Sequence, residues 1–171
     1  GVPVQLLPPG VDFELYHPQP AAVALRRDLG LRDGERVITF TGSTTFANAG
    51  EIQELVAAVR LLNERGRPTR LIRTGFHPAE FTDRYDFNWR AFPLDLGFIA
   101  KARLPALLAL ADVLVQPGHP GDFNDYRLPS KLPEFLAAGR PVILPAANIA
   151  AQLLDGTDAL VLQTGTPGEI A

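Results

Sequence analysis

The chain of 171 residues contains no cysteine and no methionine, and only 8% of its residues are aromatic. Without thiols, a disulfide framework and thiolate chemistry are excluded. The three histidines, His17, His77 and His119, lie too far apart to form the spacing of a zinc site. No apolar run approaches the roughly 20 residues of a membrane-spanning helix. The lack of an initiator methionine predicts an excerpt from a longer chain.

Charge of either sign is also sparse and evenly spread. The 16 Lys and Arg residues against 19 Asp and Glu residues give a formal net charge of -3, and no run of like charges occurs. Nucleic-acid binding depends on a basic footprint, so a nucleic-acid partner is not expected. An apolar content of 46% over this length is enough for the core of one soluble domain.

Short β-rich runs alternate with longer runs of helical period, which predicts a parallel sheet covered by helices. The expected strands are Val37–Thr41, Arg70–Thr74, Phe92–Leu96, Val113–Gln116, Val142–Leu144 and Ala159–Leu162. Right-handed crossovers would stack these units into a doubly wound α/β domain, in which ligands bind at the carboxyl ends of the strands. An additional strand is conceivable at Val4–Leu7, within a connector that also holds a short helix around Arg26–Asp28.

The clearest helix lies between the first two strands and has one apolar face, formed by Ile52, Leu55, Val56, Val59 and Leu62. Asn48 and Glu51 have the spacing of a capping box at its start, and Gly66 and Pro68 mark its end. Further helices are expected around Leu104–Ala111, Lys131–Ala138 and Ile149–Leu154. The segment Phe76–Arg90 has no clean period, and its aromatic residues suit either a packed loop or a partner surface.

Two loops could carry chemistry. The first, 42–50, is rich in small and hydroxylated residues (among them Gly42, Ser43, Thr44 and Asn48) just before a helix N-terminus. Free amides and the helix dipole favour an anion there, although such composition also occurs in plain turns.

The second loop, 117–131, ends where Ser130 is positioned to cap a helix. Lys131 is one of only two lysines in the chain, the other being Lys101, and it suits either phosphate binding or simple solvation. Glu134, inside that helix, could point along the cleft or into water.

Several stretches of the sequence form a recognisable combination. They are Pro9-Gly10-Val11-Asp12 with Phe13 and Pro18 following, a strand ending in Gly42, and the segments 96–99, 111–117 and 129–143. The last is the most specific, because Ser130-Lys131 and Glu134 precede Gly139, Pro141 and Val142. Together they resemble the C-terminal half of the retaining, group 1 nucleotide-sugar glycosyltransferases, which have two Rossmann-like domains facing each other in the GT-B architecture.

The resemblance implies that residues 1–18 are an interdomain linker and the end of an absent N-terminal domain. Residues 19–171 would then form the nucleotide-sugar-binding domain, stopping before the family's closing helices. Phe98 and Ile99 match the loop that meets the base, and Glu134 matches the glutamate that accepts bonds from the ribose. The helix that begins near Ser130 would direct its amides at the diphosphate, with Lys131 adding charge. No metal or other cofactor is implied, because amides and basic groups stabilise the leaving diphosphate.

The sequence departs from the family pattern at two places. Tyr126 stands where the sugar-contacting glutamate is expected, so that role has been lost or has passed to Asp122 or Asp125. Gly42-Ser43 and Asn48-Ala49 stand where the family has its basic diphosphate contacts, which leaves Lys131 as the nearest replacement. The resemblance therefore assigns donor binding to the residues above and leaves the catalytic side chains unknown.

The expected partners are a nucleotide-sugar donor and, through the absent domain, an acceptor glycan or lipid-linked glycan. A cytoplasmic location is expected, and peripheral association of the full-length protein with the inner face of the membrane is compatible with such an acceptor. Two alternatives stay open: a non-catalytic Rossmann module for protein association, and a nucleotide-sugar epimerase of similar two-domain build.

Overall fold

The computed structural model describes residues 3, 9–79, 93–148, 150, 153 and 156–171. These residues form one six-stranded sheet in which every strand pair is parallel. The strands are β1 (Arg36–Thr41), β2 (Thr69–Thr74), β3 (Pro93–Asp95), β4 (Val113–Val115), β5 (Val142–Pro145) and β6 (Leu160–Leu162). Each of the six expected strands is present, and the doubly wound α/β fold is confirmed.

The spatial order of the strands is β3-β2-β1-β4-β5-β6. From β1 the chain therefore adds β2 and β3 on one side of the sheet. It then crosses to the other side of β1, where it adds β4, β5 and β6. In such sheets, the crevice outside the carboxyl ends of the two central strands is the usual ligand site. The loops that follow β1 and β4 are consequently the part of the fold on which function depends.

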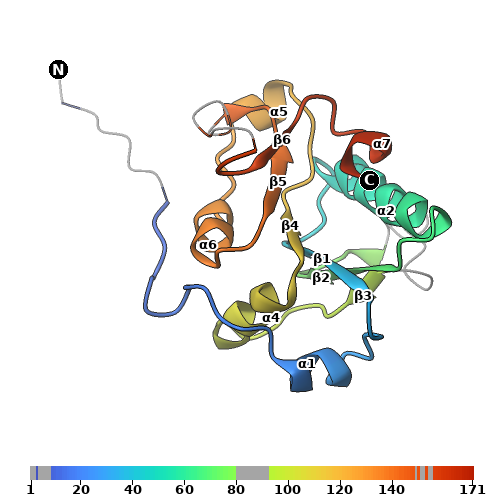
Figure 1. Cartoon of the computed structure of the whole chain (residues 1–171). Helices are drawn as coiled ribbons and strands as arrows, with labels where there is room; N and C mark the ends of the chain where they lie inside the picture. The colour runs from blue at the N-terminus through green and yellow to red at the C-terminus, as the bar shows by residue number, and fades with distance from the viewer. Residues whose placement is uncertain (1–2, 4–8, 80–92, 149, 151–152, 154–155) are drawn as a thin grey trace.

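Helices cover both faces of the sheet (Figure 1). They are α1 (Val23–Asp28), α2 (Ala49–Glu64), η1 (Lys101–Arg103), α4 (Leu104–Leu110), α5 (Asp122–Asp125), α6 (Leu132–Ala137) and α7 (Pro167–Ile170). The short helices α5 and α7 were not expected from the sequence, because four residues are too few to show a helical period. The expected helix at Ile149–Leu154 and the aromatic residues of 80–90 fall largely outside the described residues, as does the strand at Val4–Leu7.

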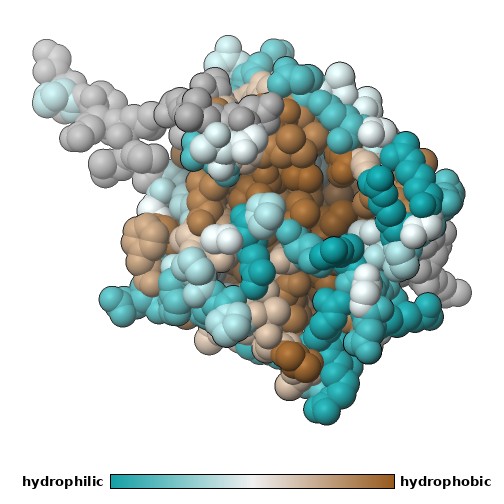
Figure 2. Space-filling model, in the orientation of Figure 1, coloured by the Kyte–Doolittle hydropathy of each residue, from teal (hydrophilic) through white to brown (hydrophobic). Residues whose placement is uncertain are grey.

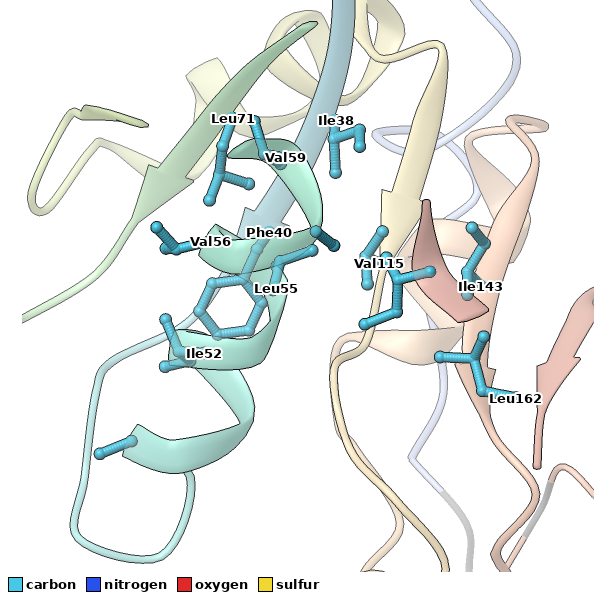
Figure 3. Close-up of a cluster of buried hydrophobic side chains, with 13 residues drawn as sticks. Ile38, Phe40, Ile52, Leu55, Val56, Val59, Leu71, Val115, Ile143 and Leu162 are labelled. Atoms are coloured by element: carbon cyan, nitrogen blue, oxygen red, sulfur yellow. The ribbon is translucent and has the colours of Figure 1, made fainter. Parts of the chain in front are cut away.

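The alternation of side chains along each strand separates the core into two layers. Ile38 and Phe40 of β1 face α2, whereas Val37 faces α4. Figure 3 shows the first layer, where the α2 stripe packs on side chains from neighbouring strands such as Val115 and Ile143. Burial of one such side chain contributes about 1.5–3 kcal/mol to the stability of the fold. The periodic apolar residues that predict α2 therefore also hold this helix on the sheet.

Two predicted helix caps are wrong. Asn48 is the N-cap residue of α2, but its side chain makes no capping hydrogen bond, because its Oδ1 accepts from the amide of Thr45 at 2.7 Å. Glu51 does not complete a capping box either, since it is buried and bonded to a distant loop. Helix α6 begins at Leu132 with Lys131 as its N-cap residue, so Ser130 lies one residue too early to cap it and is exposed.

Residues before the sheet pack on its second layer. Tyr16 is buried, at 1% exposure, in a cluster with Leu132 and Phe135 of α6. Pro18 lies so close to Gly139 that a Cβ on that glycine would be 2.8 Å from the Pro18 Cγ. The described part of the segment expected to be a linker is therefore fastened to α6. No helix among the described residues is long and apolar enough to span a bilayer.

Apolar side chains also gather on part of the surface. Figure 2 shows them in the middle of the face turned to the viewer, surrounded by hydrophilic residues. A cavity of about 940 Å³ lies at the amino ends of β4, β5 and β6, lined by residues that include Val113, Val142 and Leu160. The cavity therefore lies at the opposite ends of the strands from the loops that follow β1 and β4.

Candidate functional site

The loops that follow the carboxyl ends of β1 and β4 bring together two residues that the sequence analysis selected separately. Gly42 follows β1 with a φ of +139°, a conformation that L side chains rarely adopt. A Cβ placed on Gly42 would lie 2.7 Å from Nζ of Lys131, which comes from the loop after β4. The backbone conformation therefore favours glycine at this position, and a Cβ there would displace the flexible end of the Lys131 side chain.

The Lys131 side chain is half-buried, and its ammonium lies against other groups of the protein. Its Nζ lies 4.2 Å from the centre of the Phe40 ring, a distance at which a cation is attracted to the ring face. Burial, and next the positive charge of Arg127, lower the pKa of Lys131 to about 7, although the carboxylates of Glu51 and Glu134 favour its charged form. Lys131 donates no hydrogen bond to any of the described residues, so its amine is available to a ligand.

Next to this lysine, a buried carboxylate ties the first turn of α2 to the loop after β4. Glu51 is 5% exposed, and its Oε1 accepts a hydrogen bond from Nδ2 of Asn124 at 2.6 Å. Its Oε2 lies 3.9 Å from the Arg127 guanidinium, and Nδ1 of His119 lies 3.9 Å from Oε1. Burial raises the pKa of Glu51 against the opposing influence of these three neighbours.

Arg127 is held in place by its own contacts as well. Its NH2 group donates to Oδ1 of Asn124 at 2.8 Å, and its guanidinium lies 4.2 Å from the centre of the Phe123 ring. Burial lowers the pKa of Arg127, and Glu51 opposes this effect. Two cations, Arg127 and Lys131, therefore share one enclosed corner beside the first turn of α2, where the helix dipole also favours an anion.

The side chains proposed as a phosphate cradle are already bonded within the fold. Oγ of Ser43 accepts from the amide of Phe76 at 3.1 Å, and Oγ1 of Thr44 lies 3.0 Å from Nδ1 of His77. Nδ2 of Asn48 donates to the Ser43 carbonyl at 3.1 Å. These contacts fix the loop after β1 to the loop after β2, so the three side chains shape the crevice and are not free to extend into it.

The loop expected to meet a base is adjacent. Gly97, after β3, accepts a hydrogen bond from the amide of Gly75 at 2.7 Å, which places it beside the loop after β2. Phe98 is 79% exposed, whereas Ile99 packs against the core cluster around α4. Phe98 is therefore the member of this pair whose side chain can reach a ligand, while Ile99 anchors the loop.

A buried arginine supports the same edge of the sheet. Arg73, at 0% exposure, donates to Asp95 of β3 at 3.2 Å and to the Gly75 carbonyl at 2.8 Å. The ion pair joins the carboxyl ends of β2 and β3 and holds the turn that approaches Gly42. Arg73 is thus a support of the crevice that the sequence analysis did not select.

The remaining candidates lie on α6 and α5. Glu134, in the first turn of α6, is half-buried and near enough to Lys131 to favour its charge, and it is also next to the Tyr16 hydroxyl. Asp122 and Asp125 are both exposed on α5, and the residue between them that turns inward is Asn124. The described residues contain no group of three or more His, Asp or Glu side chains arranged to hold a metal ion.

Reasoning from the sequence missed Glu51, Asn124 and Arg127 as members of this site. Glu51 carried a signal, since it is a carboxylate in the apolar-rich first turn of α2, but the capping box offered a local explanation for it. Arg127 also carried one, because it is the basic residue nearest to Lys131 in the same loop. Their association depends on a contact between residues 73 positions apart, which no local pattern reveals.

A doubly wound parallel sheet with helices on both faces defines a Rossmann-like domain. The profile of the family "Glycosyl transferases group 1" matches residues 35–171. Because this match covers most of the chain, the chain belongs to the group 1 glycosyl transferase family, which confirms the resemblance inferred from the sequence.

Two curated relatives are similar over nearly the whole chain. The D-inositol 3-phosphate glycosyltransferase of Nocardia farcinica is 25% identical, over 94% of this chain and 36% of the relative. The alpha-galactosylglucosyldiacylglycerol synthase of Streptococcus pneumoniae is 27% identical, over 91% of this chain and 42% of the relative. The chain therefore spans well under half the length of these relatives.

Solved structures show the same fold. The C-terminal domain of a group 1 family glycosyl transferase (LpcC) from Francisella tularensis superposes with a TM-score of 0.71 at 18% identity, over 95% of this chain and 84% of that domain. Anabaena Alr3699/HepE, crystallised with UDP and glucose, gives a TM-score of 0.67 at 20% identity, over 95% of this chain and 44% of that chain. The fold is thus that of the C-terminal domain of a GT-B protein.

Proposed function

We propose that this chain is the donor-binding half of a glycosyltransferase, which holds a nucleotide sugar at the crevice between β1 and β4 for transfer of a hexosyl group with retention. The observation that carries the proposal is the half-buried Lys131 ammonium, which lies against Gly42 and the Phe40 ring and donates no hydrogen bond within the described residues. Enclosing an ammonium is costly unless something pairs with it, and a diphosphate is the anion that the family's donors provide.

In this proposal, Lys131 and Arg127 neutralise the diphosphate and stabilise it as the leaving group. Charge-assisted hydrogen bonds to phosphate are about twice as strong as neutral ones, and they act here in a partly dehydrated corner. The amides of the first turn of α2 lie on the same side of the sheet and favour the same charge. A metal ion is not required for this chemistry, and none is included in the proposal.

The nucleoside and the sugar would lie on either side of the diphosphate. Glu134 would accept from the two cis hydroxyls of the ribose, as a carboxylate can do with both of its oxygens. Phe98 lies in the loop that would meet the base. Asp122 and Asp125 are the exposed carboxylates of the loop after β4 and remain the candidates for contacts to the sugar.

The relatives suggest which donor to test first. Anabaena Alr3699/HepE was crystallised with UDP-glucose, and again with UDP alone. One curated relative is named for D-inositol 3-phosphate and the other for alpha-galactosylglucosyldiacylglycerol, so the names share no acceptor. We therefore choose a uridine nucleotide as the first ligand, and the proposal leaves the acceptor to the rest of the protein. A cytoplasmic location, at the membrane face where the acceptor is lipid-linked, belongs to the same proposal.

One observation favours a second candidate, a non-catalytic Rossmann module. The side chains of Ser43, Thr44 and Asn48 are all occupied by contacts within the fold, and the family's basic residues are absent from this loop. A domain that had lost its ligand would be free to use these groups for its own stability. Absence of nucleoside diphosphate binding would support this alternative.

The test is calorimetric titration of the chain with UDP, GDP and ADP, and with the matching nucleosides. Lys131→Ala should weaken binding of the diphosphate by about 10- to 150-fold, which corresponds to the roughly 1.5–3 kcal/mol of a hydrogen bond to a charged group. It should leave nucleoside binding unchanged. The matched control is Lys101→Ala, which removes the only other lysine of the chain, an exposed residue of η1. Equal losses for nucleoside and diphosphate would refute the phosphate contact.

A further inference from the structure

The segment that precedes the sheet presents one side chain to the candidate ribose-binding residue. Asp12 organises a turn in which its carbonyl accepts from the amide of Tyr16 at 2.8 Å and its Oδ1 accepts from the amide of Glu14 at 3.0 Å. The turn directs the Tyr16 ring into the core beside α6, where it is 1% exposed. Tyr16 is therefore a fixed part of the domain.

The chain after Tyr16 is held against the end of α6 as well. Pro18 lies against Gly139, where a Cβ would come within 2.8 Å of its ring. The NH2 group of Arg140 donates to the carbonyl of Gln19 at 3.0 Å. With these contacts on one side and the turn at Asp12 on the other, Tyr16 can leave its position only if the segment detaches from α6.

The hydroxyl of Tyr16 is the unusual part of this arrangement. It is buried and forms no hydrogen bond of ordinary geometry with the described residues, although the carboxylate of Glu134 is near enough to accept one. Its charged neighbours are Glu134, on α6, and Asp12, in its own turn. Burial, followed by the charge of Glu134, raises the pKa of Tyr16 to about 12, so the hydroxyl keeps its proton and stays a donor at neutral pH.

We propose that Tyr16 is a positioning residue, whose hydroxyl donates to one oxygen of Glu134 and thereby holds that carboxylate toward the ribose of the donor. This inference rests on the proposed function, because it takes Glu134 as the ribose-binding residue. A carboxylate has about four acceptor sites, so one bond from Tyr16 leaves enough for a pair of cis hydroxyls. Fixing a binding group before the ligand arrives reduces the entropy lost on binding.

The position of Tyr16 gives this contact a further consequence. The residue belongs to the segment that the sequence resemblance identifies as the connection between the two domains of the full-length protein. A donor that orders Glu134 would also favour the packed position of Tyr16, and detachment of the segment would release Glu134. Donor binding and the position of the connection are then linked through a single hydrogen bond.

The experiment compares each ribonucleoside diphosphate of the UDP, GDP and ADP panel with its 2′,3′-dideoxy analogue, for the wild type and for Tyr16→Phe. The variant keeps the buried ring and removes only the hydroxyl, so its thermal stability should be unchanged or slightly higher. We expect it to bind the ribonucleotide roughly 3- to 30-fold more weakly and to bind the dideoxy analogue as the wild type does. Added to Glu134→Gln, it should cause no further loss.

The matched control is Thr39→Val on β1, which also removes a buried hydroxyl that has no partner within the described residues and should change neither affinity. Equal losses for both ligands in Tyr16→Phe, or no loss for either, would overturn the inference and leave the donor-binding proposal standing. If the wild type binds a diphosphate but does not distinguish the dideoxy analogue, the ribose role of Glu134 fails, and this inference fails with it. If it binds no diphosphate at all, the donor-binding proposal itself is refuted.

Discussion

The affinity of this chain for a nucleotide sugar should fall as the pH rises through neutrality, because of Lys131. Burial and the nearby charge of Arg127 lower the pKa of this lysine to about 7 in the free protein. A bound diphosphate would favour the protonated amine and return the pKa toward the ordinary lysine value. Binding then takes up a proton above about pH 7, and each further rise in pH makes that uptake more costly.

The magnitude follows from the two pKa values. With a pKa of about 7 in the free protein and an assumed value near the reference of about 10.4 in the complex, the affinity should be roughly 20-fold weaker at about pH 8.5 than at about pH 6.5. The diphosphate of a nucleotide sugar carries no group that titrates in this range, which makes the intact donor a better probe than the free diphosphate. Calorimetry in two buffers of different ionisation enthalpy should show the proton uptake directly.

The stability of the free protein should respond to pH in the opposite direction. Between about pH 7 and the unfolded-state pKa of 10.5, the unfolded chain binds a proton at Lys131 that the folded chain does not. Stability contributed by this residue therefore rises with pH across that window. Both trends should disappear in Lys131→Gln, which keeps the length of the side chain but cannot titrate. A wild-type affinity that does not change with pH, or a Lys131→Gln variant that keeps the trend, would refute the reasoning.

Two further predictions concern the walls of the site. Gly42→Ala should destabilise the fold by about 1–3 kcal/mol in urea denaturation, because a side chain strains the backbone at a φ of +139°. It should also weaken diphosphate binding, because its Cβ would displace the lysine ammonium that lies 2.7 Å away; wild-type affinity in this variant would contradict the arrangement. Glu51→Ala should cost about 3–5 kcal/mol, since it leaves enclosed cations without their carboxylate, whereas Glu54→Ala on the same helix should stay within about 0.5 kcal/mol. Similar costs for the two variants would show that the burial of Glu51 has no special importance.

The architecture could be predicted from the sequence because its signals are local. Most strands are short runs rich in β-branched residues, and α2 has a stripe of apolar residues at helical spacing. The glycines at 42 and 97 mark strand ends, where a positive φ is needed. Packing confirmed these elements and changed only their ends, as at β4, which stops at Val115, one residue earlier than expected.

The site could be predicted only in part, since its members are joined by contacts that are not local. Gly42 and Lys131 were both selected, but nothing in the sequence shows that one lies against the other. The spacing of Asn48 and Glu51 also fits a capping box, so the sequence alone does not show that Glu51 belongs to the site. In the structure Glu51 bonds to Asn124, because a buried carboxylate gains more from an amide donor and the nearby Arg127 guanidinium than from a helix end exposed to water.

The balance of charge in this corner explains why a ligand should belong there. Arg127 and Lys131 face Glu51 and Glu134, yet burial lowers the pKa of both cations and raises that of Glu51. All three shifts have the same cause, since each group has given up water without gaining full compensation from its neighbours. The lowered pKa values of Arg127 and Lys131 mean that the free domain holds their charged forms at a cost. A diphosphate would supply the missing counter-charge to the two cations. Binding of the donor would therefore offset the unfavourable free energy of holding Arg127 and Lys131 in this corner.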